Sequence, residues 1–311
     1  MSQNTNSPAP ILVTGAHRSG TTWVGKMLAA GGQAAYISEP LNVLHRPGVY
    51  AAPIQHWYTY ICTENEADFL PALQQTLAFR YHTWDEIRSL RSRKDALRMG
   101  RDWSTFLGGK LLKKRPLLKD PFAVFSAPWF ASRLGSRVVI TVRHPAAFAS
   151  SLKRLSWRFQ FNDLLSQPLL MKHLLQPFRA EIEAVPPDDT VGQAALLWKI
   201  IYHTVDEYHR QNPEFIILRH EDLSLNPLEG FSKLYSALGL HFNTRTQQTV
   251  IESSSTDNPR EVSTDAVHAY RLNSRANLAH WKSRLTRDEL QRIARITAET
   301  AALFYPDIDW G

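Results

Sequence analysis

Near its amino terminus the chain carries a short apolar run, a glycine-bounded loop and an amphipathic segment in direct succession. Residues 11–14 are apolar enough to form a buried strand. The loop that follows begins at Gly15 and ends at Gly20, and the apolar residues of 21–30 have helical spacing. A strand, a glycine loop and a helix in this order form a phosphate cradle, because loop N–H groups and the helix N-terminus face the anion. This segment therefore predicts an α/β fold with a phosphate site after its first strand.

The loop matches a Walker A motif only in part. Its two glycines have the Walker A spacing, but Thr21 and Thr22 stand where that motif has Lys and then Ser or Thr. The lysine that bridges the β- and γ-phosphates of ATP is therefore missing, and Arg18 inside the loop supplies a cation instead. Such a loop suits a phosphate but is poorly equipped to hold Mg-ATP. The alternative is an ordinary strand-to-helix turn with an incidental arginine.

Composition limits the class of protein. The chain has 311 residues, of which 43% are hydrophobic and 21% charged, and this suits one large globular domain. A net charge of +7 favours anionic ligands, but the basic residues are spread along the chain rather than gathered in one tail. Cys62 is the only cysteine, so no intramolecular disulfide can form, and no Cys/His group has the sequence spacing of a zinc motif. The chain has no membrane-spanning apolar run and no signal-peptide core, so we expect a cytoplasmic location.

Two predicted strands deliver an acidic and a basic side chain. Glu39 follows the strand predicted at 34–38, and Lys119 closes the strand predicted at 116–119. Because open α/β sheets bind ligands beyond the carboxyl ends of their strands, both side chains are candidates for the site. A carboxylate there could take the proton of a hydroxyl nucleophile. The alternatives are a surface glutamate that caps a turn, and a lysine that forms an ion pair with Asp120 or another neighbour.

Arg143 and Ser151 form a second candidate for anion binding. The strand predicted at 137–142 is rich in β-branched residues, and Arg143 follows it directly. Ser151 lies two turns into the helix predicted at 146–154, so the guanidinium and the hydroxyl could reach the same phosphate. A helix-capping arginine and a serine bonded to its own backbone are the alternatives.

Together these motifs resemble the nucleotide site of sulfotransferases that use 3′-phosphoadenosine 5′-phosphosulfate (PAPS). The run Arg18-Ser19-Gly20-Thr21-Thr22-Trp23 resembles the family's 5′-phosphosulfate loop, and Arg143 with Ser151 eight residues on resembles its 3′-phosphate motif. The resemblance implies that these residues bind PAPS as donor and 3′-phosphoadenosine 5′-phosphate (PAP) as product, with no metal required. It also implies that Trp23 stacks on the adenine, for which core packing is the alternative.

The resemblance assigns the remaining charged residues as well. A Glu-Pro pair about twenty residues after the loop cation is typical of carbohydrate-type and many bacterial members, and here Glu39-Pro40 implies a base at Glu39. Cytosolic members have a lysine that contacts the sulfuryl group. That lysine precedes their 3′-phosphate arginine by as many residues as Lys119 precedes Arg143. Their histidine base, two residues after that lysine, is replaced here by Pro121. Glu39 is therefore the better candidate for the base.

Two further regions match the family only in part. The stretch that begins at His220 resembles the family's Tyr-Glu-Asp-Leu, with His220 where the adenine-contacting tyrosine stands. The stretch that contains Asn273-Ser274-Arg275 resembles the loop over the 3′-phosphate, although the family's Arg-Lys-Gly triplet is not reproduced. Arg275 is the cation that we expect at the 3′-phosphate, and Arg271 is the alternative.

We predict one α/β domain of the P-loop type, with three layers and a central, mainly parallel sheet of about five strands flanked by helices. Residues 1–10 are expected to be a disordered arm, and residues 11–311 the sulfotransferase domain, with acceptor-side insertions near 43–110 and 155–190. The first insertion is predicted to hold one helix over 66–78. The second should contain short helices broken near its prolines, and could form a lid, a homodimer face or a contact with a membrane surface.

The sequence thus predicts in-line transfer of a sulfuryl group from PAPS to a hydroxyl of a glycan, a lipid or a natural product. Glu39 would act as base, and Arg18 and Lys119 would stabilise charge on the leaving phosphate. The alternatives are a P-loop small-molecule kinase, which would need Mg²⁺ and ATP, and a non-catalytic protein that binds PAP or PAPS. Nucleic acid is not expected as a partner, because only the net charge favours it.

Overall fold

The core of the protein is a sheet of five parallel strands, in the order β2-β3-β1-β4-β5. It is seen in a computed structural model that describes residues 8–259 and 270–311, so most of the predicted arm lies outside the described residues. The parallel sheet of five strands confirms the predicted fold class. The strands are β1 Ile11–Gly15, β2 Ala34–Ser38, β3 Arg115–Lys119, β4 Arg137–Val142 and β5 Ile216–Arg219.

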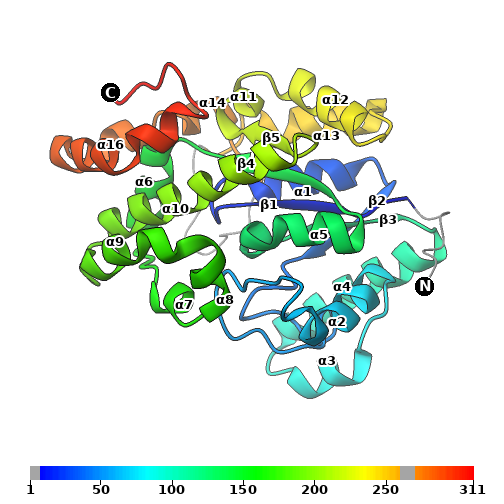
Figure 1. Cartoon of the computed structure of the whole chain (residues 1–311). Helices are drawn as coiled ribbons and strands as arrows, with labels where there is room; N and C mark the ends of the chain where they lie inside the picture. Colours follow the sequence, from blue (N-terminus) through cyan, green and yellow to red (C-terminus); the bar gives the residue numbers. More distant parts are fainter. Residues whose placement is uncertain (1–7, 260–269) are drawn as a thin grey trace.

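Helices connect and flank the strands (Figure 1). The longer ones are α1 Thr21–Ala30, α2 Leu70–Leu77, α4 Arg93–Leu111, α5 Ala127–Leu134, α6 Pro145–Leu155, α10 Thr190–Gln211, α12 Pro227–Ala237, α13 Thr244–Ser254 and α16 Arg287–Ala302. The shorter ones are α3 Thr83–Ser89, α7 Asn162–Leu165, α8 Pro168–Leu170, α9 Arg179–Ala184, α11 His220–Leu225, α14 Ser274–Asn277 and α15 Trp281–Arg284. Single turns are η1 Glu66–Asp68, η2 Pro121–Ser126, η3 Met171–Leu175 and η4 Gln176–Phe178.

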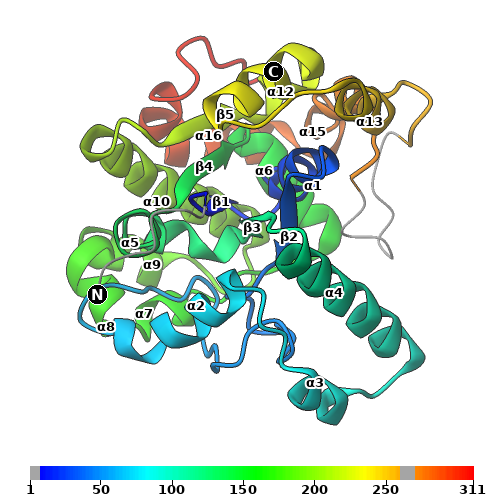
Figure 2. The ribbon, with the colours of Figure 1, turned by 90° about the vertical axis from the view of Figure 1, so that its right-hand side faces the viewer.

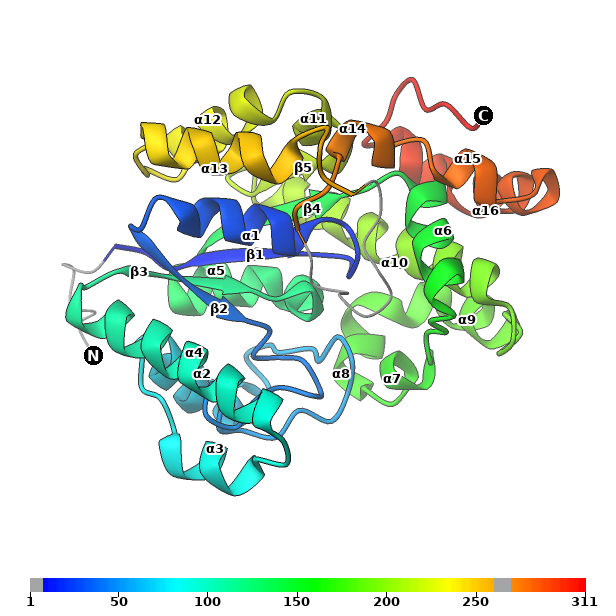
Figure 3. The ribbon, with the colours of Figure 1, turned by 180° about the vertical axis from the view of Figure 1, so that it is seen from behind.

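Both faces of the sheet are covered, which gives the three predicted layers. Ile11 and Val13 of β1 belong to a hydrophobic cluster with α1, α12 and α13, whereas Leu12 belongs to the cluster formed with α5, α6 and α10. Alternate side chains of one strand thus enter two separate cores, as expected for a parallel strand buried on both sides. Figures 1 and 3, taken from opposite sides, show first α5 and α10 and then α1 and α13 in front of the strands.

The order of the strands places the glycine loop at the point where ligands bind in such sheets. β1 pairs with β3 on one side and with β4 on the other, so the chain builds the sheet outward from β1 in both directions. Open α/β sheets bind ligands beyond the carboxyl ends of their strands at this topological switch point. The loop between β1 and α1 lies there.

The two predicted insertions contain more local structure than the sequence indicated. The helix predicted over 66–78 is not continuous, because η1 ends before Phe69 and α2 begins after it, with a proline in its first turn. Further along, α4 packs beside the edge strand β2 (Figure 2). In the second insertion, a new helical run begins at Pro168, which confirms the predicted break there. At Pro177 the run continues, but it changes from the π-helical turn η3 through η4 to α9. Among the described residues, no helix combines the length and the apolar character needed to cross a membrane.

Candidate active site

The β1–α1 loop has a backbone that two glycines make possible. Gly15 and Gly20 have positive φ angles of 136° and 101°, which glycine adopts at little cost. A Cβ atom would lie 2.4 Å from the carbonyl oxygen of Thr141 at Gly15, and 2.6 Å from Nδ1 of His220 at Gly20. Ser19 is buried beneath the loop, with its hydroxyl 2.6 Å from Oγ1 of Thr141. The loop is therefore packed directly against β4 and against the residue that follows β5.

A cavity of about 770 Å³ lies in front of this loop, and the residues that follow β2, β4 and β5 help to line it. Most of the predicted site residues therefore come together. Those in the lining are Arg18, Gly20, Thr21, Thr22, Trp23, Glu39, Arg143, Ser151 and His220. Ser19, Lys119 and Arg275 are not among the lining residues.

Lys119 reaches the cavity only through Glu39. Its side chain is about 1% exposed, and its ammonium pairs with Oε1 of Glu39. Lys119 therefore forms an ion pair, as the alternative interpretation of the sequence predicted, and its partner is Glu39 rather than Asp120. A direct contact between Lys119 and the sulfuryl group stays a prediction.

Arg275 is the predicted site residue that the structure places elsewhere. Asn273 caps the short helix α14 by accepting from the backbone N–H of Ala276 at 3.0 Å. Within that helix the guanidinium of Arg275 donates to the carbonyl of Leu225 at 2.9 Å, at the end of α11. This local fold keeps it out of the cavity lining, and Arg284 of α15 contributes to that lining instead.

Four arginines of the cavity wall lie within electrostatic reach of one another: Arg18, Arg143, Arg154 and Arg284. Burial, and then the charges of Arg143 and Arg154, lower the pKa of Arg18 to about 10. Burial, and then the charge of Arg154, also lower the pKa of Arg284. Crowding like charges in a partly buried wall is unfavourable unless an anion is bound among them. The wall is therefore suited to a polyanion.

The two anion-binding motifs of the sequence adjoin in space. The sequence assigns Arg18 and Ser151 to opposite ends of one nucleotide, yet Nε of Arg18 donates to Oγ of Ser151 at 3.3 Å. Nη1 of Arg143 also donates to the carbonyl of Arg18 at 3.1 Å. The loop and the β4–α6 junction thus form one continuous surface for phosphate groups.

Polar atoms without a partner in the described part of the chain show where such a ligand fits. Nε of Arg143, Oγ of Ser150 and Nδ1 of His220 are buried and unsatisfied there. Phosphate oxygens would satisfy the guanidinium and the hydroxyl with charge-assisted hydrogen bonds. Burial, and then the charge of Arg143, lower the pKa of His220 to about 3, so its ring is neutral and packs edge-on against Trp23. The cavity therefore offers buried donors for phosphate oxygens beside a pair of aromatic rings.

Trp23 has a structural role as well. Its indole N–H donates to Oγ of Ser253 at 2.9 Å, and its ring packs edge-on against Phe231 of α12 at 5.2 Å between centroids. It is nevertheless part of the cavity lining. Both readings of Trp23, core packing and adenine contact, therefore remain compatible with its position.

Glu39 is held from three sides. Its φ angle of 50° is left-handed, and its backbone N–H donates to the carbonyl of Lys119 at 2.8 Å. Oε1 meets the Lys119 ammonium, and Oε2 accepts from Nδ2 of Asn42 at 2.6 Å. Nearby, burial and then the charge of Glu39 raise the pKa of Asp120 to about 7. Burial lowers the pKa of Lys119, but the attraction of Tyr36 and Glu39 outweighs it and raises that pKa overall.

His17 is a cavity residue that the sequence analysis missed. The hydroxyl of Tyr58 accepts from the backbone N–H of His17 at 3.2 Å and lies 2.6 Å from its Nδ1. Burial, and then the charge of Arg18, lower the pKa of His17 to about 4, so the ring is neutral. If the Tyr58 hydroxyl donates to Nδ1, the proton of the ring is on Nε2. In the sequence, only the position of His17 inside the glycine loop could have indicated that it lines the cavity.

Arg154, Arg284 and Ser150 were also missed. Arg154 lies one turn beyond Ser151 on α6, and helical spacing puts residues three apart on the same face. The sequence therefore contained a signal for Arg154. Ser150 and Arg284 have no comparable pattern, because their place in the wall depends on how α6 and α15 pack.

This fold and cavity define a class of nucleotide-binding protein, in which a P-loop-like cradle and an arginine wall surround the phosphate site. A model of the Sulfotransferase domain matches residues 8–304, and the chain belongs to that family. It is therefore a PAPS-dependent sulfotransferase, which takes a sulfuryl group from PAPS and forms PAP. This assignment decides against the kinase and the non-catalytic binding protein that the sequence left open.

Solved sulfotransferases resemble the chain at low identity. Sulfotransferase STF9 from Mycobacterium avium is 14% identical, with 98% of this chain and 79% of that one covered and a TM-score of 0.49. The sulfotransferase domain of the curacin biosynthetic pathway is 16% identical, with 94% and 98% covered and a TM-score of 0.46. The corresponding domain of the Synechococcus PCC 7002 olefin synthase is 15% identical, with 99% of both chains covered and a TM-score of 0.46. No curated protein sequence matches the chain significantly.

Proposed function

We propose that Glu39 deprotonates an acceptor alcohol as the sulfuryl group of PAPS is transferred to it. The observation that supports this role is that Glu39 is the only acidic residue among the described residues of the lining, which carries five arginines. Two histidines of the lining, His17 and His220, have pKa values lowered to about 4 and 3, so both are weak bases. A carboxylate is the better proton acceptor in this cavity.

The bonds of Glu39 fix the direction of its carboxylate. Lys119 donates to Oε1, and Asn42 donates to Oε2. Because Glu39 lines the cavity, an acceptor hydroxyl that enters the cavity meets an oriented carboxylate. In this role Lys119 is a positioning residue, because it acts through Glu39.

The proposed step balances without a further reactant. The acceptor oxygen attacks the sulfur of PAPS, the bond between sulfur and the phosphate oxygen breaks, and the acceptor proton passes to Glu39. The products are a sulfate ester and PAP. Negative charge grows on the leaving phosphate, where Arg18 and the loop N–H groups of Thr21 and Thr22 would stabilise it. Arg143 and Ser151 would hold the 3′-phosphate.

The walls around Glu39 support an acceptor with an apolar portion. Trp57 and Phe122 pack with their centroids 4.5 Å apart, and both line the cavity together with Trp157 and Leu44. Trp157 and Leu44 are also exposed, 40% and 79% respectively, so apolar surface continues to the mouth. We therefore propose an alcohol on a lipid, a natural product or a glycan with an apolar group. A cytoplasmic location, a homodimer and contact with a membrane surface remain predictions from the sequence.

An acceptor panel tests the proposal. Alcohols and phenols with matched carbon skeletons are incubated with PAPS, and we measure PAP release together with the mass gain of one SO₃ on the acceptor. We expect alcohols to be preferred, and Glu39→Gln to lower turnover about 10²- to 10⁴-fold, the usual range for loss of a general base. Glu181→Gln, on the exposed face of α9 and paired with Lys199, is the matched control and should change little. A preference for phenols would overturn the acceptor class, and near-normal turnover of Glu39→Gln would overturn the base.

A further inference from the structure

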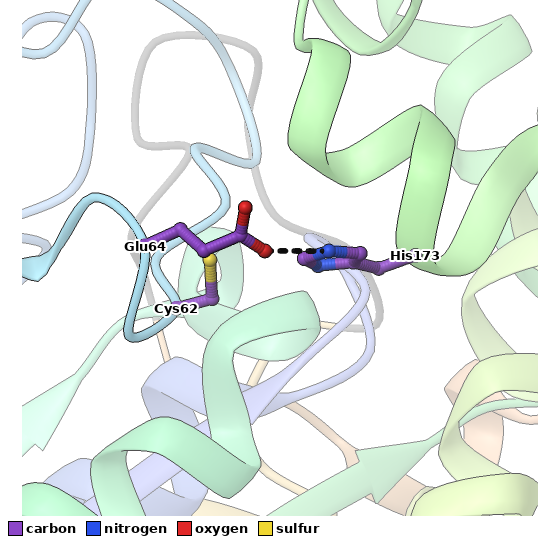
Figure 4. Close-up of side chains that lie close together, drawn as sticks. All are labelled: Cys62, Glu64 and His173. Carbon is purple, nitrogen blue, oxygen red and sulfur yellow. Dashed lines mark ion pairs between the residues drawn. The ribbon is translucent and has the colours of Figure 1, made fainter.

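Outside the cavity, three side chains able to bind a metal lie close together at the surface. Cys62, Glu64 and His173 each offer one ligand atom, and these atoms all lie within 4.8 Å of one another. Figure 4 shows the carboxylate of Glu64 facing the imidazole of His173, with the thiol of Cys62 beside the Glu64 side chain. The residues come from two segments more than 100 positions apart in the chain, a turn before η1 and the π-helical turn η3. We propose that this cluster is a Zn²⁺ site.

The orientation of the imidazole favours coordination through Nε2. Nε2 of His173 lies 2.8 Å from Oε1 of Glu64, whereas Nδ1 lies 3.3 Å from the hydroxyl of Tyr60. Histidines that bind metals usually have a hydrogen-bond partner on the other ring nitrogen, which fixes both tautomer and ring orientation. Tyr60 is in place to do this, since its oxygen can accept from an N–H on Nδ1. The lone pair of Nε2 then faces Cys62 and Glu64.

The carboxylate is also arranged to give one oxygen to the metal. The ammonium of Lys172 lies 3.5 Å from Oε2 of Glu64, on the oxygen that does not face the imidazole. Oε1 is therefore the oxygen directed toward His173 and Cys62. A surface ion pair of Glu64 with His173 and Lys172 is the competing interpretation, and such pairs contribute little to stability.

The two segments are held together by bonds that do not involve the cluster. Asn65 closes the turn by accepting from the N–H of Cys62 at 2.8 Å and donating to the carbonyl of Tyr60 at 2.8 Å. Gln167, just before α8, accepts from the N–H of Tyr60 at 2.8 Å and donates to the carbonyl of Tyr58 at 3.3 Å. The ligands are therefore brought together before any metal binds, which reduces the cost of ordering them.

The ligand types select zinc. A thiolate, an imidazole and a carboxylate are ligands that Zn²⁺ commonly takes in proteins, at about 2.0 to 2.3 Å, with water able to fill the fourth position. Tetrahedral geometry at such distances requires ligand atoms roughly 3.4 Å apart, so side-chain shifts of about 1 Å would suffice. Binding replaces the thiol proton, which is released to solvent. The metal would tie the segment that carries Trp57 to the insertion that carries Trp157, both part of the cavity wall.

The single cysteine makes the test specific. The untagged, reduced, metal-free chain is titrated with Co²⁺ as a spectroscopic substitute, and Zn²⁺ is then added in competition. Because Cys62 is the only thiol in the chain, a thiolate-to-cobalt charge-transfer band can arise only there. We expect the band to appear, Zn²⁺ to abolish it, and Zn²⁺ to raise the melting temperature, since a ligand that binds the folded state stabilises it.

Variants separate the site from general metal binding. Cys62→Ser should abolish the charge-transfer band and His173→Gln should weaken Zn²⁺ binding at least tenfold. His203→Gln, which replaces a half-exposed histidine on α10 that lies 3.6 Å from Glu207, is the matched control and should retain full affinity. Absence of the band in the unmodified chain, or equal Zn²⁺ affinity of His173→Gln and the control, would overturn the proposal. PAP binding is measured on every variant to confirm folding, and it is independent of this outcome.

Discussion

Lys119→Met tests how the buried pair with Glu39 stabilises the site. The Lys119 side chain is about 1% exposed and that of Glu39 about 14%, so the substitution leaves a largely buried carboxylate without its cation. Removing one member of a fully buried pair typically costs about 3–5 kcal/mol of unfolding free energy. Because Glu39 borders the cavity and keeps its bond from Asn42, we expect a somewhat smaller loss than that, about 2–4 kcal/mol at pH 8.

The pH dependence follows from Asp120. Its pKa in the folded protein is about 7 against an ordinary 3.8, so the folded state holds this proton more tightly. Its contribution to stability is therefore present at low pH and is lost as the pH rises toward 7. The charge of Lys119 lowers this pKa, and without it ionisation of Asp120 beside Glu39 becomes more costly. Lys119→Met should consequently destabilise the protein more at pH 8 than at pH 5.

Urea unfolding followed by tryptophan fluorescence measures these effects, with the double variant Lys119→Met/Glu39→Gln completing a thermodynamic cycle. We expect the double variant to recover part of the loss, with a coupling energy of about 1.5–3 kcal/mol. Lys199→Met, which breaks the exposed pair with Glu181, is the control and should cost less than about 1 kcal/mol. If Lys119→Met costs no more than this control, or if the two losses simply add, the pair does not stabilise the site as argued.

Three further predictions concern neighbouring residues. Arg143→Ala should weaken PAP binding about 10- to 100-fold by calorimetry while leaving 5′-AMP binding nearly unchanged, since a charged hydrogen bond contributes about 1.5–3 kcal/mol. Arg210→Ala, at an exposed position near the end of α10, is the control, and an equal loss for both nucleotides would contradict a 3′-phosphate role. Tyr58→Phe should lower the unfolding free energy by about 1–3 kcal/mol, because His17 would lose a buried partner, and an unchanged urea midpoint would refute this. Asp120→Asn should gain stability relative to the unmodified chain as the pH rises from about 4 to 7. The gain should be no more than about 1.4 kcal/mol per pH unit. A difference in unfolding free energy that does not change with pH would show that Asp120 does not titrate in this range.

The donor side of the site could be predicted because its signals are local. Gly15, Arg18 and Gly20 lie within six residues, and the glycine spacing predicts both the turn and the helix start. Arg143 and Ser151 sit on one strand–helix junction, and their spacing places both toward the same side. The parallel sheet could also be predicted, since β-rich segments alternate with helical ones, but the order of its strands was not predicted. Five parallel strands and the position of the cradle followed from these patterns.

Side-chain partners across the sheet could not be predicted in the same way. Nothing in the local sequence shows that Lys119 bonds Glu39, 80 residues earlier, or that Arg18 meets Ser151, 133 residues later. Arg275 is a further case, because the sequence did not show that its short helix directs its guanidinium to the carbonyl of Leu225 and not into the cavity lining. The helix α13 was also not predicted, because its sequence is mostly polar and has no strong apolar stripe. It nevertheless packs Val250 into the core beside α1.

The acceptor side differs from the donor side in how it is built. Its apolar residues come from three segments that are remote in the chain, with Leu44 and Trp57 after β2, Phe122 after β3 and Trp157 after α6. Each of these residues can therefore change without altering the glycine loop or the β4–α6 junction. Shape and polarity around Glu39 depend on side chains from the two insertions and from η2, whereas we expect the phosphates to depend on short motifs at strand ends. Changes in acceptor selectivity therefore need not alter the glycine loop or the β4–α6 junction, and for that reason the family assignment determines the donor but not the acceptor.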